Sequence, residues 1–162
     1  MPRCELPSLL ARAYAAPDIT RPFARHQRSD EWCEYAAQLL GSSACGRFDP
    51  ERSTAWLSPE GRLDGAVVTT IVGPGTAHLA QVAVDPARRG AGMATTLVTS
   101  AMERVRAERF ERVSLLVSEH NAAARRLYER LGFRATSSFI AAGRPAPATI
   151  AANRSRRHEA AR

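Results

Sequence analysis

The chain has no lysine, although 23 of its 162 residues are basic, and every one of these is arginine. A lysine nucleophile, a Schiff-base mechanism and an internal lysine acetylation site are therefore excluded. The sequence also has no long apolar run, which argues against a membrane-spanning segment, and residues 1–5 lack the apolar stretch of a secretory signal. We therefore expect a cytoplasmic protein without a membrane partner.

Cysteine is scarce as well. Cys4, Cys33 and Cys45 are odd in number and their spacing fits no metal site, so we expect reduced thiols and no bound metal. The net charge of +7 comes from arginines that are scattered, with few aromatic residues between them and no nucleic-acid motif. We therefore expect no nucleic-acid partner, and we interpret the charge as an attraction for phosphate groups or an acidic acceptor.

The length and the 44% hydrophobic content are typical of one domain with a proper core. In the first half, the patterns predict helices over residues 6–15 and 30–40, a hairpin from strands 54–57 and 63–72, and a turn at residues 73–75. Ser29 or Asp30 should cap the second helix and Gly41 should end it.

The most informative stretch is VDPARRGAGMA, residues 84–94, which joins a strand, a glycine-rich turn and the start of a helix. Residues 78–84 are mostly apolar and predict the strand, which should end before Pro86 because proline cannot donate to a sheet ladder. Gly90 and Gly92 permit a sharp turn and leave room for a ligand against the main chain. From Gly92 the apolar spacing becomes helical.

The start of that helix is a candidate anion site. Its first N–H groups lack intrahelical partners, its dipole is positive there, and Arg88 and Arg89 lie close by in the sequence. The glycine spacing fits neither a phosphate-binding loop ending in Gly-Lys-Ser/Thr nor Gly-x-Gly-x-x-Gly with a later acidic residue. Nucleotide hydrolysis and dinucleotide binding are therefore disfavoured.

A second motif follows this helix in the sequence. Residues 111–118 contain four large apolar side chains and predict a mostly buried strand, and Asn121 is a candidate cap for a following helix. That helix should end at Gly132. Its predicted apolar face comprises Ala123, Ala124, Leu127, Tyr128 and Leu131.

Residues 84–94 and 121–133, in this order and at this separation, resemble the two cofactor motifs of the GCN5-related N-acetyltransferase (GNAT) superfamily. The resemblance covers roughly residues 63–139. It implies an α/β (α+β) fold, with a mixed, mostly antiparallel sheet flanked by helices, and acetyl-CoA as co-substrate. The residues implied in cofactor binding are Val82, Ala83, Val84, Arg88, Arg89, Gly90, Ala91, Gly92, Met93, Ala94, Asn121 and Tyr128.

The resemblance also implies a division of roles. The loop amides from Arg89 to Ala94 would bind the pyrophosphate, residues 82–84 would offer main-chain groups to the thioester and the pantetheine arm, and Asn121 would reach the pantetheine. Tyr128 occupies the position of the general acid that protonates the departing thiolate. An amine attacking the thioester develops an oxyanion, which fixed backbone donors stabilise.

The general base is left open. Relatives that acetylate protein N-termini carry a glutamate at the position of Leu116, so that activity is disfavoured here. A water relay without a single essential base is one alternative. The remaining candidates are Glu119, His120, His78, Gln81, Glu34 and Tyr35.

Two departures from the family pattern concern the ends of the chain. The family's first strand has no candidate before residue 6, and the last strands are reduced to one expected over residues 133–141. We expect one acyltransferase domain over residues 1–143, with a Pro/Arg-rich, disordered tail over residues 144–162. Residues 17–27, with Trp32 and Tyr35, are expected near the acceptor.

The functional hypothesis is an acetyl-CoA-dependent N-acetyltransferase acting on a primary amine, preferably of a small molecule and secondarily of a protein. A homodimer is compatible with it. The alternative is a non-catalytic acyl-CoA-binding regulatory module, because no convincing base is present. A nucleic-acid-binding protein ranks third.

Overall fold

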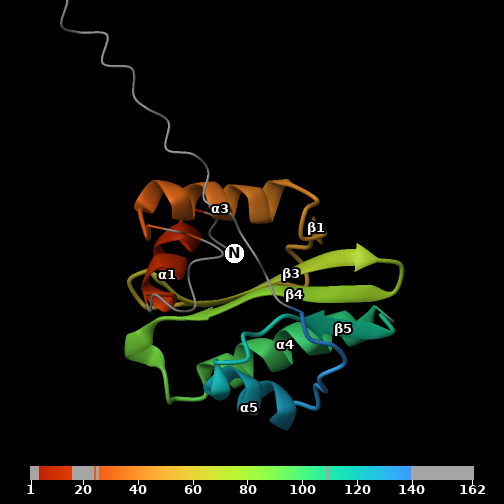
Figure 1. Ribbon diagram of the computed structural model, residues 1–162. Coiled ribbons are helices and arrows are strands. Elements are labelled where there is room, and N and C mark those ends of the chain that lie inside the picture. The colour runs from red at the N-terminus through yellow and green to blue at the C-terminus, as the bar shows by residue number, and fades with distance from the viewer. Residues whose placement is uncertain (1–3, 16–23, 25, 109, 140–162) are drawn as a thin grey trace, which may run out of the picture.

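The computed structural model describes residues 4–15, 24, 26–108 and 110–139. One sheet lies between two helical layers (Figure 1). The helices α1 (Leu6–Ala13) and α3 (Ser29–Gly41) cover one face, and α4 (Met93–Ala107) and α5 (Ala122–Arg130) cover the other. We call these the α1/α3 face and the α4/α5 face.

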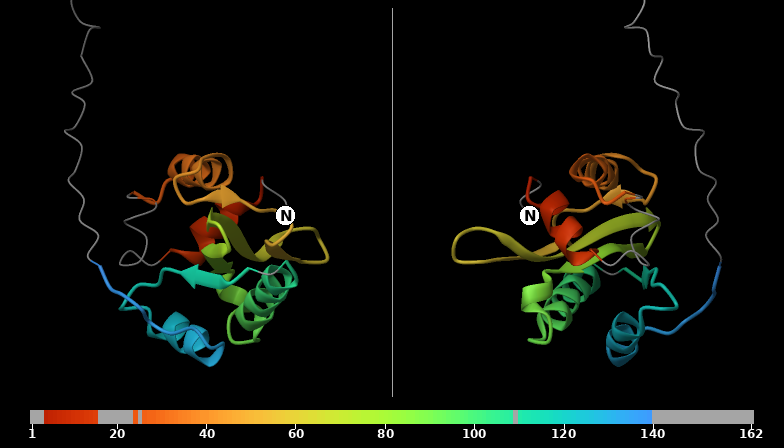
Figure 2. Two further views of the ribbon diagram at one scale, coloured as in Figure 1. Left: turned by 90° about the vertical axis from the view of Figure 1, so that its right-hand side faces the viewer. Right: turned by 60° about the vertical axis from the view of Figure 1, so that its left-hand side comes forward.

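The sheet is mixed and mostly antiparallel, as the sequence predicted. Its strands are β1 (Arg47–Phe48), β2 (Thr54–Leu57), β3 (Leu63–Gly73), β4 (Thr76–Val84) and β5 (Arg112–Leu115). Strand β3 pairs antiparallel with β4 on one side and with β1 and β2 on the other, whereas β5 pairs parallel with β4. The predicted hairpin is confirmed, and Figure 2 shows its β2–β3 loop reaching out beyond the helices.

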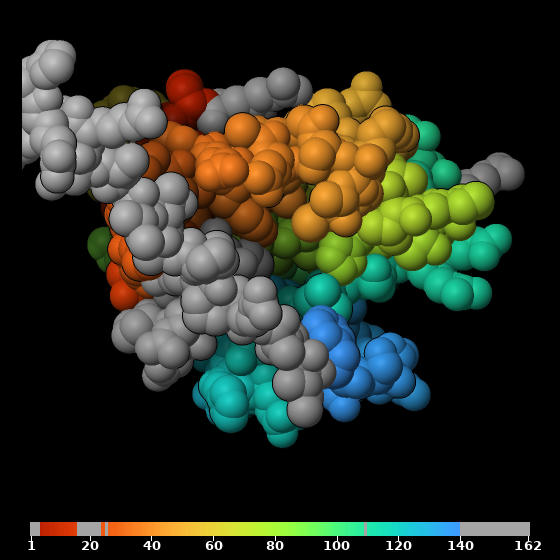
Figure 3. Space-filling model, turned by 45° about the horizontal axis from the view of Figure 1, so that its top comes forward, coloured from red at the N-terminus to blue at the C-terminus, as the bar shows by residue number. Residues whose placement is uncertain are grey.

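Each face of the sheet has its own apolar core. On the α1/α3 face, Leu6, Leu9, Leu10 and Trp32 pack on Leu63, Ala66, Val68 and Ala83. On the α4/α5 face, Leu97, Val98, Ala101 and Tyr128 pack on Val67 and Leu79. Figure 3 views the α1/α3 face. Helix α3 lies across the molecule there, and the end of the β3–β4 hairpin extends past it. Strand β3 is buried continuously from Leu63 to Thr70, as expected of a strand covered on both faces.

Several sequence predictions are corrected in the C-terminal part. The strand expected over residues 111–118 ends at Leu115, and Leu116 and Val117 are exposed because no helix or strand covers them in the described part of the chain. Residues 133–139 form no strand, and residues 140 and 141 lie outside the described residues. On α5, Ala123 is exposed instead of lying on the apolar face.

The N-terminal boundaries also differ slightly. Helix α1 ends at Ala13, two residues before the predicted end, and α3 begins at Ser29 with Arg28 as its cap residue. Glu31, not Ser29 or Asp30, reaches back to this terminus, where its carboxylate accepts from the main-chain N–H of His26 at 2.8 Å. The short strand β1 was not predicted. The expected tail, residues 144–162, lies outside the described residues.

None of the helices in the described ranges is long and apolar enough to cross a membrane.

Candidate functional site

Strand β4 changes its partners in its middle. Val68 of β3 is opposite Gln81, but the next residue, Thr69, is opposite Leu79, so Ala80 is an extra residue and forms a β-bulge. Pairing with β5 also ends at Leu79, which is opposite Leu115. Beyond the bulge, β4 has no strand partner on its β5 side among the described residues. Its main chain from residue 80 to residue 84 therefore forms an open edge.

The glycine-rich loop begins directly where this open edge ends. Asp85 caps a single 3-10 turn, Pro86–Arg88, by accepting from the N–H of Ala87 at 3.0 Å. Gly90 and Gly92 have φ angles of +82° and +78°, a left-handed conformation that side chains disfavour, which explains why glycine stands at both positions. Gly92 is the N-cap of α4.

The amides of this loop are available to a ligand. Within the described residues, no acceptor contacts the N–H groups of residues 90–95, and the loop from Arg88 to Gly92 is exposed. Open N–H groups beside the positive end of the α4 dipole form a favourable environment for a phosphate group. The predicted loop residues are therefore brought together with their main chain free.

The two arginines of the loop are engaged within the protein. Arg88 donates from Nε to Oδ2 of Asp64 at 2.9 Å, and Arg89 donates from Nη2 to the main-chain oxygen of Ala13 at 2.6 Å. Because both guanidinium groups already have partners, the main chain is the better candidate for direct anion contact.

Helix α5 positions Tyr128 below the open edge. The helix begins where predicted, because Asn121 Oδ1 accepts from the N–H of Ala124 at 3.1 Å. Tyr128 is buried in a cluster that also includes Val82, Val84 and Met93, so it lies among residues of β4 and the start of α4. Its ring stacks edge-on against Phe133 with 5.8 Å between the ring centroids. Burial raises the pKa of Tyr128 to about 12, so the phenol keeps its proton at neutral pH.

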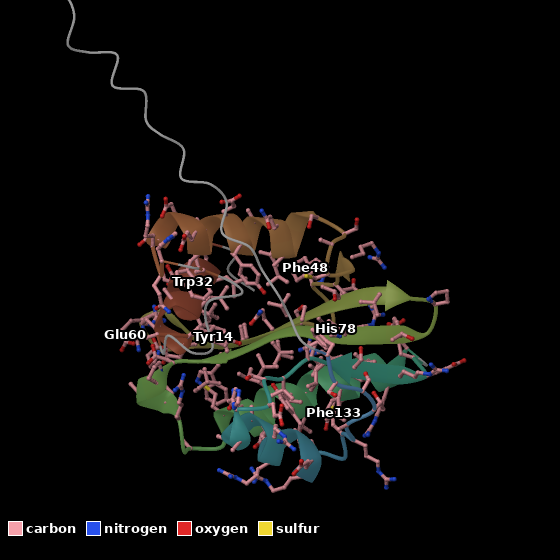
Figure 4. All side chains as sticks on the ribbon, in the orientation of Figure 1. Tyr14, Trp32, Phe48, Glu60, His78 and Phe133 are labelled. Carbon is pink, nitrogen blue, oxygen red and sulfur yellow. The ribbon has the colours of Figure 1, made fainter. Side chains whose placement is uncertain are left out.

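The opposite face of β4 carries a polar network that the sequence did not reveal. The hydroxyl of Tyr14, which follows α1, lies 2.7 Å from Gln81 Oε1 and 3.0 Å from the main-chain oxygen of Val82. The Gln81 amide in turn donates to the hydroxyl of Tyr35 on α3. Because Ala80 is the bulge residue, both it and Gln81 meet the α1/α3 face. In Figure 4, Tyr14 and Trp32 lie on this side and Phe133 on the other.

Tyr14 is influenced by groups on both faces of the sheet, namely Tyr35 on the α1/α3 face and Tyr128 on the α4/α5 face. Burial raises the pKa of Tyr14, the neighbouring phenols of Tyr128 and Tyr35 raise it further, and the Arg89 guanidinium opposes them. Burial also raises the pKa of Tyr35 to about 12. All three phenols are therefore neutral at physiological pH, and none can serve as a base there.

The remaining candidate bases are dispersed. His78 faces Ser114 of β5, with 2.9 Å between Nδ1 and Oγ, and burial lowers its pKa, which keeps the imidazole neutral. Gln81 carries no titratable group. Glu34 is exposed on α3 and accepts from Gln38, and Glu119 and His120 are exposed after β5. No group of three or more potential metal ligands occurs in the ranges that the structure describes.

Comparison with known proteins identifies the family. The acetyltransferase (GNAT) family matches residues 11–133, and the chain belongs to this family. It is 34% identical over 125 residues to a mycothiol acetyltransferase of Salinispora tropica. The matched region covers 74% of this chain and 40% of that protein. A mycothiol acetyltransferase of Kineococcus radiotolerans is 35% identical over 118 residues, with 73% and 37% covered. The chain thus spans about two fifths of the length of these relatives.

Solved structures support the same fold. A putative acetyl transferase from Pyrococcus furiosus matches with a TM-score of 0.64 and 21% identity, over 86% of this chain and 91% of that one. The ribosomal-protein-S18-alanine N-acetyltransferase from Escherichia coli matches with a TM-score of 0.61 and 23% identity, over 84% and 72%. At these identities the likeness concerns the fold alone.

Proposed function

We propose that the chain transfers an acetyl group from acetyl-CoA to the primary amine of a small molecule. The observation that carries this proposal is that the edge of β4, which β5 does not pair with beyond Leu79, leads through the turn at Pro86–Arg88 into the exposed amides of residues 90–95. An extended ligand with a diphosphate at one end fits this sequence of groups. Family membership supplies the chemistry that such a ligand would undergo.

Each part of the site has a role in this proposal. The amides of the glycine loop and the first turn of α4 bind the diphosphate. The main chain of Val82, Ala83 and Val84 aligns the pantetheine arm and the thioester, and a fixed N–H of this edge stabilises the oxyanion formed when the amine attacks. Asn121 approaches the pantetheine from α5. As the carbon–sulfur bond breaks, the Tyr128 hydroxyl gives its proton to the thiolate.

The proposed acceptor lies on the α1/α3 face of β4. Gln81, Tyr14 and Tyr35 meet there, and none of these side chains is charged at neutral pH. A small-molecule acceptor is also consistent with the relatives named as mycothiol acetyltransferases. No single base is required if the amine arrives partly deprotonated or loses its proton to water. In this proposal the protein works in the cytoplasm, and a homodimer is compatible with it.

An acceptor screen tests the proposal. Purified protein is mixed with acetyl-CoA and a panel of small-molecule amines, and release of the CoA thiol is followed. We expect sustained thiol release with at least one small amine and none without an acceptor. Binding of acetyl-CoA without turnover on any small amine, peptide or protein N-terminus would instead support a non-catalytic acyl-CoA-binding module. Transfer confined to peptides or protein N-termini would replace the small-molecule acceptor with a protein amine.

A further inference from the structure

The C-terminal turn of α1 is tied to the glycine loop from both directions. Arg12 donates from Nε to Oδ2 of Asp85 at 2.7 Å and from Nη2 to the main-chain oxygen of Leu63 at 2.9 Å. Arg89 of the loop returns a bond to the main-chain oxygen of Ala13 at 2.6 Å. That oxygen belongs to the negative end of α1, where a cation is favourable. One arginine of α1 thus bonds to the loop, and one arginine of the loop bonds to α1.

The partner of Arg12 is a buried carboxylate with a structural task in the loop. Asp85 is 4% exposed, and its other oxygen accepts from the N–H of Ala87, which shapes the turn that precedes the glycines. The Arg12 guanidinium is the main reason why the pKa of Asp85 lies below its usual range. Arg62 also approaches the same oxygen, at 3.9 Å, but Arg12 is the nearer partner, and a buried charge that loses its partner is strongly destabilising.

A second buried carboxylate fixes the neighbouring residues. Asp64 is fully buried at the start of β3 and receives Arg88 at 2.9 Å and Arg62 at 2.8 Å. Its main-chain oxygen also accepts from the N–H of Asp85 at 2.8 Å. Both carboxylates therefore hold the same loop, but of the two only Asp85 accepts from a side chain of α1.

We propose that the C-terminal turn of α1, residues 12–14, positions the glycine loop for diphosphate binding, with Arg12 acting through Asp85. Arg12 is a positioning residue in this scheme and does not contact the ligand. The next residue but one, Tyr14, contacts the main chain of β4, so one turn of α1 touches both the loop and the open edge. This inference rests on the proposed function and adds to it a link between the α1/α3 face and the cofactor loop.

The test compares two acetyl thioesters that share the pantetheine arm but differ in the diphosphate. Dissociation constants for acetyl-CoA and S-acetylpantetheine are measured by thermal-unfolding titration of the full chain. In Arg12→Gln, we expect acetyl-CoA to bind about tenfold more weakly, as for the loss of one charge-assisted hydrogen bond, while S-acetylpantetheine binds as to the wild type. A general loosening of the fold would weaken both ligands to the same extent.

Two further variants keep the inference falsifiable. Arg28→Gln removes an arginine whose exposed side chain pairs with Asp30 and not with the loop, and it should bind both thioesters as the wild type does. Asp85→Asn keeps an oxygen for the Ala87 N–H but loses the charge, so it should reproduce the Arg12→Gln result, also if Arg12→Gln does not fold. Adding Arg12→Gln to Asp85→Asn should cause no further loss of acetyl-CoA affinity.

The outcomes separate this inference from the function on which it rests. If wild-type protein binds neither thioester, the proposed function and this inference both fail. If wild-type protein prefers acetyl-CoA and Arg12→Gln keeps the same preference, only the positioning role is overturned. A further tenfold loss from Arg12→Gln in the Asp85→Asn background would show direct contact between Arg12 and the ligand, and would also overturn it.

Discussion

The surroundings of Tyr128 keep its phenol protonated, as its proposed role requires. It is buried among apolar residues of β4 and α4, and this burial raises its pKa to about 12. A phenol in this state carries its proton throughout the physiological range. The raised pKa makes the phenol a weaker acid, so in the proposed mechanism the transfer depends on holding the hydroxyl beside the sulfur while the carbon–sulfur bond breaks.

Replacing Tyr128 by phenylalanine keeps the ring and removes this proton. We expect turnover to fall about a hundredfold while acetyl-CoA affinity barely changes, because the ring packing is retained. Between pH 6 and 9 the pH profiles of wild type and Tyr128→Phe should have the same shape, since the phenol does not titrate there. Unchanged turnover, measured with the amine found in the acceptor screen, would reduce Tyr128 to a packing residue.

Single residues were predictable from the sequence where their role is local. Asn121 as a helix cap and Gly92 as the residue before α4 depend on neighbours three or four positions away, and both were placed correctly. The partners of Arg12 and Tyr14 were not predictable, because they lie 51 to 73 and 67 to 68 positions further along the chain. Which buried polar groups meet across such distances is decided by tertiary packing.

At the scale of elements, β4 determines the geometry of the site. The sequence predicted a strand over residues 78–84, and the strand forms over Thr76–Val84. The bulge at Ala80 has no local signature, because it is defined by the registers with β3 and β5. The strand expected over residues 133–141 failed over its described part for a related reason. A local sequence can favour a strand, but it does not show that a partner edge is in reach.

The contact between β4 and β5 should make the stability of the fold depend on pH through His78. Burial beside Ser114 lowers the pKa of His78, so the unfolded chain binds a proton before the folded one does. The stabilisation is therefore fully present above the unfolded pKa of about 6.5 and is lost as the pH falls below it.

Urea unfolding at pH 7.5 and pH 5.5 measures this effect. Wild type should lose more stability between the two values than His78→Gln, which has no imidazole to protonate. His120→Gln, on an exposed loop, serves as the matched control and should resemble wild type. An equal loss of stability in wild type and His78→Gln would exclude His78 as the source of the pH dependence.

At the scale of the whole molecule, the two faces of the sheet have different proposed tasks. The α4/α5 face carries Tyr128 and the start of α4, whereas the α1/α3 face carries Tyr14, Tyr35 and Gln81. The fold, the glycine loop and the cap of α5 were predictable because each motif is contiguous in the sequence. The proposed acceptor side was less predictable, since its residues come from three separate segments.

This division predicts which change affects the acceptor. Tyr35→Ala should raise the Michaelis constant for the amine found in the screen, because it removes the partner of the Gln81 amide. The Michaelis constant for acetyl-CoA should stay near its wild-type value. Deleting residues 153–162, which contain few apolar side chains, should change neither constant. Loss of transfer on deletion of those residues alone would assign the acceptor site, or a subunit contact, to them.

Acetyl-CoA binding to the folded chain tests the central claim most directly, because it requires neither an acceptor nor turnover. Thermal unfolding is recorded with increasing acetyl-CoA, in wild type and in Gly92→Val, whose side chain would stand in the exposed loop at a φ of +78°. At about a hundredfold excess over the dissociation constant, wild type should gain roughly 2.7 kcal/mol of stability, whereas Gly92→Val should fold and show no gain. The absence of any shift for wild type at millimolar acetyl-CoA would contradict the assignment of this site.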